Sequence, residues 1–274
     1  MRGVYSMAAL AELEDQGLAD AFDVVIGTSA GAVNGAYFLA RQANDAVSVY
    51  THSLNSRTFF NPARVRRIVD VDFMVDVALK ERLPIDQEAL FSSESELCVV
   101  VTDTESGEAH FLSTRDLAFD TYEVFRATAA IPILYNKRIE INGRTYVDGA
   151  LTDAIPVEEA ISRGAGLIVS VLTRAPTYRH QAMGPVRRAS ANFLSRGHTE
   201  EVRGLIGLEL RKLNEALEFL SGDKEFPTGV QSHTVWPTDL KRLVSLGTIN
   251  QERLLDCAQL GRADMRAALA KAAY

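Results

Sequence analysis

The chain has 274 residues, of which 47% are hydrophobic, so it can bury a sizeable core in one large domain or in a domain with an extension. Its net charge of −7 argues against broad nucleic-acid binding, because contacts with phosphate need a basic surface. No stretch approaches the roughly 18 uninterrupted apolar residues of a membrane span, and the first residues lack the apolar region of a secretory leader. We therefore expect a cytoplasmic globular protein.

The sequence shows no pattern of metal ligands. Cys98 and Cys257 fall in separate predicted elements and are expected to be reduced core residues. The five histidines are scattered, without two on one helix face. We expect neither a metal site nor another cofactor.

Helical and strand patterns alternate along the first 172 residues, which is typical of a mostly parallel sheet covered by helices. In chain order, the predicted elements are a helix over 4–14 that ends at Gly17, a strand over 22–26, helices over 30–42 and near 44–54, strands over 97–102 and 108–112, a helix over 121–130 stopped by Pro132, a hairpin over 138–147 that turns at Asn142-Gly143, and a buried strand over 166–172.

The pattern changes after residue 172, which predicts a core over 1–172 and a mostly helical extension over 173–274. Two helical stretches, 199–221 and 249–272, follow an arginine-rich segment. In that segment, Arg174, Arg179, Arg187, Arg188 and Arg196 accompany Met183, Phe193 and Leu194. These side chains form either a cationic amphipathic face that contacts an anionic membrane peripherally, or a solvated surface helix.

The run Gly27-Thr28-Ser29-Ala30-Gly31, between a predicted strand and a predicted helix, is typical of a nucleophile elbow. Such a turn holds the serine in a strained backbone with its hydroxyl projecting, and Gly27 and Gly31 keep the strand and the helix from colliding. Free N–H groups at the start of the helix favour developing negative charge. The alternative is a glycine-rich turn without chemistry.

Asp148 ends the second strand of the predicted hairpin and is followed by Gly149. A carboxylate at such a strand end can point into a cleft while the glycine turns the backbone sharply away. Asp-Gly is also a common turn dipeptide with no catalytic role. The neighbouring segments, 125–132 and 151–157, favour the catalytic interpretation.

The blocks at residues 27–32, 126–132 and 148–160 resemble, in order and spacing, those of the patatin-like phospholipase family. The resemblance covers roughly residues 1–172, and the tail is similar to a bacterial branch of predicted patatin-like esterases. It implies a three-layer α/β/α fold with a mostly parallel central sheet. It also implies hydrolysis of lipid acyl esters through an acyl-enzyme, by a catalytic dyad of Ser29 and Asp148 without calcium.

One departure from the family concerns the oxyanion donors. The family takes them from a glycine-rich turn between its first strand and first helix, of which only Arg2 and Gly3 are present here. We expect these two residues and Ala30 to contact the oxyanion or the substrate, and we expect the preceding strand to be missing. The outer edge of strand 22–26 should then be unpaired. Ala150, in place of a second glycine, is a smaller departure.

Two alternatives remain open. An α/β-hydrolase triad could combine Ser29 with Asp148 or Asp153 and with His198 or His233, although only one strand-like segment precedes the elbow. A non-catalytic module that binds lipid or a partner protein is the other alternative.

Overall fold

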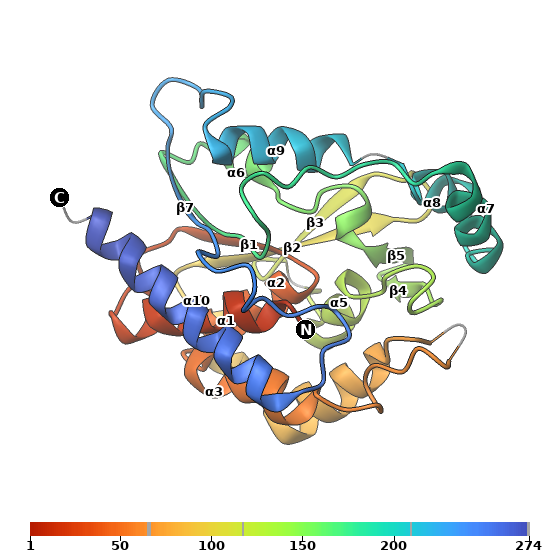
Figure 1. The fold of residues 1–274 in the computed structure, drawn as a ribbon, viewed down its shortest axis with the longest axis horizontal. Helices are drawn as coiled ribbons and strands as arrows, with labels where there is room; N and C mark the ends of the chain where they lie inside the picture. Colours follow the sequence, from red (N-terminus) through yellow and green to blue (C-terminus); the bar gives the residue numbers. More distant parts are fainter. Residues whose placement is uncertain (65–66, 117, 209, 273–274) are drawn as a thin grey trace.

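In the computed structural model, which describes all residues except 65–66, 117, 209 and 273–274, five strands form the central sheet (Figure 1). They are β1 (Val24–Thr28), β2 (Glu96–Asp103), β3 (Ala109–Ser113), β4 (Ile139–Ile141) and β5 (Arg144–Asp148). β2 is buried along almost its whole length, as its unbroken apolar run requires. It pairs in parallel with β1 and antiparallel with β3 and β5.

The central sheet is less parallel than the sequence analysis expected. β3 and β5 run antiparallel to β2, and β4 runs antiparallel to β5. The reason lies in the connections, because the Asn142-Gly143 turn, with φ of 53° and 77°, joins β4 to β5 directly. A parallel pair needs a crossover of a dozen residues or more. The expected α/β fold, with helices around a central sheet, is confirmed.

β6 (Leu167–Val171) and β7 (Gln231–Val235) form a separate parallel pair. The buried strand expected over 166–172 is β6, whereas β7 was not predicted because its residues are mainly polar. In the part of the chain that the structure describes, no strand pairs with the edge of β1 that faces away from β2.

Helices cover both faces of the central sheet (Figure 1). On one side lie α1 (Gly3–Asp15), α2 (Ala30–Leu39), α3 (Ala43–Ser48) and α10 (Gln251–Ala272). On the other side lie α6 (Val157–Ser162) and α9 (Arg211–Ser221), which enclose a second apolar cluster with β6. α5 (Thr121–Thr128) packs against β2, β4 and β5.

α1 is surrounded by protein, which explains why small and apolar residues fill almost all of its faces. It packs closely on α10, since a Cβ at Gly261 would lie 2.2 Å from the carbonyl oxygen of Tyr5. The Tyr5 hydroxyl also donates a hydrogen bond of 2.9 Å to Asp264. The segment after residue 172 therefore contributes β7 and α10 to the packing around the core. The division into a core over 1–172 and an extension over 173–274 stays a prediction.

Other helices are shorter or irregular. They are η1 (Val49–Ser53), η2 (Phe73–Arg82), α4 (Gln87–Ser92), η3 (Gly149–Leu151), α7 (Pro185–Leu194) and α8 (Glu200–Leu205). The helix expected over 44–54 continues from α3 into the wider turns of η1. The helix expected over 199–221 is split into α8 and α9, because Gly207 takes a left-handed φ of 78° between them. Among the described residues, no helix is long and apolar enough to span a membrane.

Candidate active site

Ser29 alone makes the turn between β1 and α2. Its backbone has φ 55° and ψ −124°, a conformation that residues with side chains rarely adopt. A Cβ at Gly27 would lie 2.5 Å from the backbone nitrogen of Ala32, so the turn requires glycine there. A Cβ at Gly31 would meet nothing within 4 Å, so the steric role expected for Gly31 is wrong.

Thr128 ties this strained turn to the central strand. The backbone N–H of Ser29 donates to Thr128 Oγ1 over 2.8 Å, and that hydroxyl donates to the carbonyl oxygen of Val100 over 2.6 Å. The conformation of Ser29 is therefore fixed to β2 through one buried side chain.

The sheet register brings Ser29 and Asp148 together. β1 and β5 lie one after the other along the same edge of β2, because β3 occupies the opposite edge. Thr28 pairs with Val100, and Asp148 pairs with the next residue, Val101. Since β1 runs parallel to β2 and β5 runs antiparallel, the carboxyl ends of β1 and β5 meet at this point.

The Asp148 side chain is almost fully buried, with an exposed fraction of 2%. Its Oδ1 accepts a 2.8 Å hydrogen bond from the backbone N–H of Ala150, whereas Oδ2 has no hydrogen-bond partner. Burial raises the pKa of Asp148 to about 7, although the Ala150 N–H and the neighbouring Ser29 hydroxyl act in the opposite direction. An orphan buried carboxylate oxygen beside a serine can accept the proton of its hydroxyl.

Gly149 is needed where the chain leaves β5. A Cβ at Gly149 would lie 2.3 Å from the carbonyl oxygen of Val100, the same carbonyl that accepts from Thr128. The backbone N–H of Ala150 donates to Asp148 Oδ1, and an alanine can make this backbone contact as a second glycine would. The predicted departure at Ala150 thus leaves the geometry of the Asp148 turn intact.

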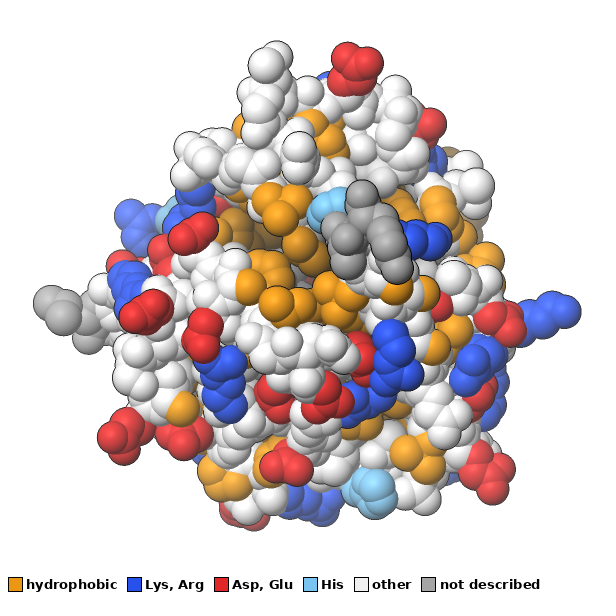
Figure 2. All heavy atoms as spheres, turned by 90° about the vertical axis from the view of Figure 1, so that its left-hand side faces the viewer, with side chains coloured by type: hydrophobic (Ala, Val, Ile, Leu, Met, Phe, Trp, Pro, Cys, Tyr) orange, Lys and Arg blue, Asp and Glu red, His pale blue; other side chains and the backbone are white. Residues whose placement is uncertain are grey.

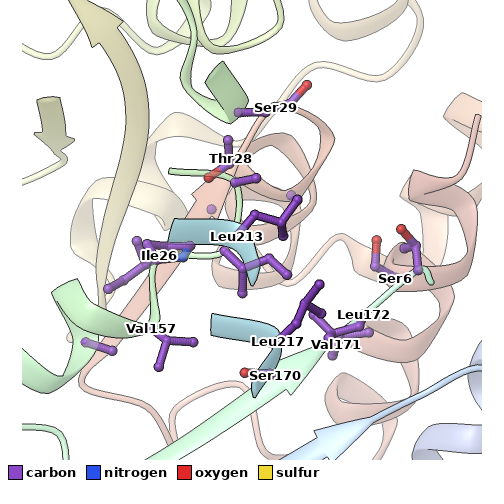
Figure 3. A pocket seen from close by; sticks show the side chains of 18 of the residues that line it. Ser6, Ile26, Thr28, Ser29, Val157, Ser170, Val171, Leu172, Leu213 and Leu217 are labelled. Carbon is purple, nitrogen blue, oxygen red and sulfur yellow. The ribbon is translucent and has the colours of Figure 1, made fainter. Parts of the chain in front are cut away.

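A cavity of about 610 Å³ opens beside Ser29. Apolar side chains of β1, α6, β6 and α9 line it, and Figure 3 shows Ile26, Val157, Leu213 and Leu217 around it, with Ser29 at one end. On the face of the molecule in Figure 2, hydrophobic side chains likewise gather around a hollow. The cavity has the apolar lining that a hydrocarbon chain requires.

Arg2, Gly3 and Ala30, the expected oxyanion or substrate contacts, all line this cavity. Gly3 is pressed against α2, because a Cβ on it would lie 2.9 Å from the Cβ of Ala30. Asn34 holds it there by donating to the Gly3 carbonyl over 2.9 Å. Burial, followed by the positive charge of Arg174, lowers the pKa of Arg2, and Arg174 lines the same cavity.

The histidines considered for a triad lie elsewhere. Both ring nitrogens of buried His198 lack a hydrogen-bond partner, and burial lowers its pKa to about 4. His233 lies on β7, and in the described part of the chain neither histidine bonds to Ser29 or Asp148. The structure therefore does not assemble the triad.

Asp153, the other carboxylate considered, is buried close to the elbow. Thr28 Oγ1 donates to its backbone carbonyl over 3.1 Å, and Lys212 Nζ lies 4.0 Å from its Oδ2. Burial raises the pKa of Asp153 to about 6, which Lys212 partly opposes. Its carboxylate faces a lysine of α9 and no histidine in the described residues, so it does not complete a triad.

No metal centre is found within the residues that the structure describes, since no three His, Cys, Asp or Glu side chains there could hold an ion. Cys98 and Cys257 are both buried and unpaired with each other.

Two contributions to the site escaped sequence analysis. Leu213 and Leu217 line the cavity from α9. The amphipathic pattern of a helix predicts that its apolar face is buried, but it does not show which part of the protein that face packs against. Thr128 stands in a block that the sequence analysis singled out, but its hydrogen bond to Ser29 links segments far apart in the chain.

An α/β fold with a serine at a strained strand-to-helix turn, beside a buried carboxylate, defines the structural class of α/β folds with a nucleophile elbow. Within that class, the chain belongs to the patatin-like phospholipase family, because the family model matches residues 1–161. It is also 33% identical over 180 residues to the uncharacterized protein YjjU of Escherichia coli (strain K12). That match covers 63% of this chain and 49% of YjjU, so the chain spans about half the length of this relative.

Proposed function

We propose that this protein hydrolyses acyl esters of lipids, with Ser29 as the nucleophile and Asp148 as the general base. One observation carries the proposal: the strained serine and a buried carboxylate with an orphan oxygen meet at one edge of β2, beside an apolar cavity. Membership of the patatin-like phospholipase family supports the same reaction class.

In the first step, Ser29 Oγ attacks the carbonyl carbon of the ester and its proton passes to Asp148. Oδ2 is the acceptor, since Oδ1 is occupied by the Ala150 N–H. With its pKa raised to about 7, Asp148 is a stronger base than an ordinary aspartate. The alcohol then leaves with that proton, and the acyl group remains on Ser29.

In the second step, Asp148 takes a proton from a water molecule that attacks the acyl-enzyme. The acid is released as Ser29 regains its proton from Asp148, so both groups return to their starting states. No histidine and no metal enters either step.

The oxyanion that forms in each step lies near the start of α2. Ala30 is the first residue of this helix, so its N–H has no acceptor within the helix and can donate to the oxyanion. Gly3 and Arg2 line the same cavity and serve as further contacts. The helix dipole of α2 adds to this stabilisation.

The cavity supports an acyl chain as the buried part of the substrate, because most of the residues that line it are apolar, with Leu, Ile and Val the largest group. Arg2 and Arg174 add positive charge to the same cavity, which favours an ester with a negatively charged head group. Phospholipids and lysophospholipids meet both conditions.

The direct test is turnover of a short-chain aryl ester by the parent protein and by Ser29→Ala. The matched control is Ser162→Ala, which removes an exposed hydroxyl of α6 that donates to Glu159. We expect Ser29→Ala to lose at least about a thousandfold in kcat/KM, and Ser162→Ala to keep parental turnover. Equal turnover by parent and Ser29→Ala would favour a non-catalytic lipid-binding module.

The substrate class needs a second assay. Lipid extracts incubated with parent or Ser29→Ala protein should differ in free fatty acid and in the deacylated lipid that matches it. Activity on aryl esters without any such difference would place the physiological substrate outside lipids.

A further inference from the structure

We propose that the outer face of α7 docks on an anionic lipid surface. The segment 173–199 carries five arginines and no acidic residue, in a chain whose net charge is −7. A concentration of one charge against the overall balance marks a surface that attracts the opposite charge. The question is then whether these arginines face solvent together with apolar side chains.

Two of the five arginines are engaged elsewhere. Arg179 forms an ion pair with Asp223, and Arg174 stacks on the Tyr178 ring, with its Cζ 4.2 Å from the ring centre. The remaining three, Arg187, Arg188 and Arg196, lie on α7 or directly after it. Within the described residues, none of these three pairs with a carboxylate.

The outer face of α7 carries large apolar side chains where helical surfaces are usually polar. Val186, Ala189, Ser190 and Phe193 follow the spacing of one helix face, and all four are exposed. Val186 and Phe193 have exposed fractions of 81% and 57%, which are high for large apolar side chains. Only Ala191 of this helix is buried.

Arginines border this face. Arg187 follows Val186 on the helix and projects beside the Val186–Phe193 ridge, and Arg196 lies two residues after the helix ends at Leu194. The Arg196 guanidinium lies 4.2 Å from the centre of the Phe193 ring, which holds the cation beside the apolar ridge. An apolar ridge bordered by arginines matches the boundary between acyl chains and anionic head groups.

The position of α7 relates this face to the candidate active site. Figure 1 shows α7 and α8 at one end of the molecule, away from α10. Ala191 belongs to the same apolar cluster as Val147, the residue before Asp148, and Leu151, three residues after it. Docking through α7 therefore holds the Asp148 end of the sheet close to the lipid surface. Only this last consequence rests on the proposed function; lipid binding itself does not.

The test is sedimentation of the protein with vesicles of phosphatidylcholine alone, or of phosphatidylcholine mixed with phosphatidylglycerol. Ser29→Ala protein is used so that hydrolysis does not change the vesicles. We expect binding to the anionic vesicles only, and expect it to weaken at high salt. Equal binding to both kinds of vesicle, or to neither, would overturn the proposal.

Variants locate the binding face. Arg187→Gln/Arg196→Gln should lower the partition coefficient on anionic vesicles about 25-fold, at about fivefold for each arginine. Val186→Ser/Phe193→Ser should also weaken binding, with unchanged net charge. The matched control, Arg253→Gln/Lys271→Gln, removes the same charge from exposed residues of α10 and should bind like the parent.

All of these residues are exposed, so circular dichroism should show parental folding for each variant. A control that weakens binding as much as the α7 variants would contradict the proposal. Failure of hydrolysis assays with normal vesicle binding would instead refute the proposed function and leave the docking face standing.

Discussion

Thr128 offers the sharpest structural prediction, because its hydroxyl connects Ser29 to the central strand. Thr128→Val keeps the shape of the side chain but removes the acceptor of the Ser29 N–H and the donor to the Val100 carbonyl. The contact to Val100 is buried, and leaving a buried polar group unpaired costs about 1–3 kcal/mol. The contact to Ser29 is only partly buried, so water can replace some of it.

We therefore expect Thr128→Val to lower the free energy of unfolding by about 2 kcal/mol, or roughly 5 °C in melting temperature. The released Ser29 turn should also lower kcat about a hundredfold with little change in KM, because a displaced nucleophile loses alignment. Thr128→Ser, which keeps the hydroxyl, is the control.

The assays are urea unfolding followed by circular dichroism and ester turnover at a temperature where every variant is folded. Thr128→Val protein with the stability and the kcat of Thr128→Ser would refute this reasoning. A loss of stability with normal kcat would show that Thr128 supports the fold but not the position of Ser29.

Three further predictions follow from the site. Since the pKa of Asp148 is about 7, kcat/KM should fall about tenfold per pH unit below that value and level off above it; a rate independent of pH between 5 and 8 would contradict the role of Asp148 as base. The folded protein binds this proton more tightly than the unfolded chain, so the contribution of Asp148 to stability decreases as pH rises toward 7, and Asp148→Asn should be more stable than the parent at pH 8 in urea titrations. Single changes of His180, His198 and His233 to Ala should leave most ester turnover intact, whereas a loss of roughly a thousandfold at one of them would support the triad.

The local features of the site could be predicted from the sequence because they depend on neighbouring residues. The strand, serine and helix around Ser29 follow from one short segment, and the Asn142-Gly143 hairpin carries its own turn chemistry. Gly27 and Gly149 were expected from motifs, and the structure explains both by close backbone approach. Gly31 was expected for the same reason, but it has open space around it.

What could not be predicted depends on contacts between distant segments. The meeting of Ser29 and Asp148 follows from the register of β1 and β5 along β2, and neither strand encodes that register alone. β7 escaped prediction because its burial is partial and its residues are mainly polar. The cavity walls from α9 likewise depend on where a helix packs, not on its own periodicity.

The central claim is that Ser29 and Asp148 act as one catalytic unit, and a double-mutant measurement of kcat/KM tests it most directly. Ser29→Ala, Asp148→Asn and the double variant should all reach a similar floor, because removing either residue disables the same step. Asp148→Asn retains an oxygen for the Ala150 N–H, so folding is preserved. Parental turnover by Asp148→Asn, or losses that multiply in the double variant, would contradict the account.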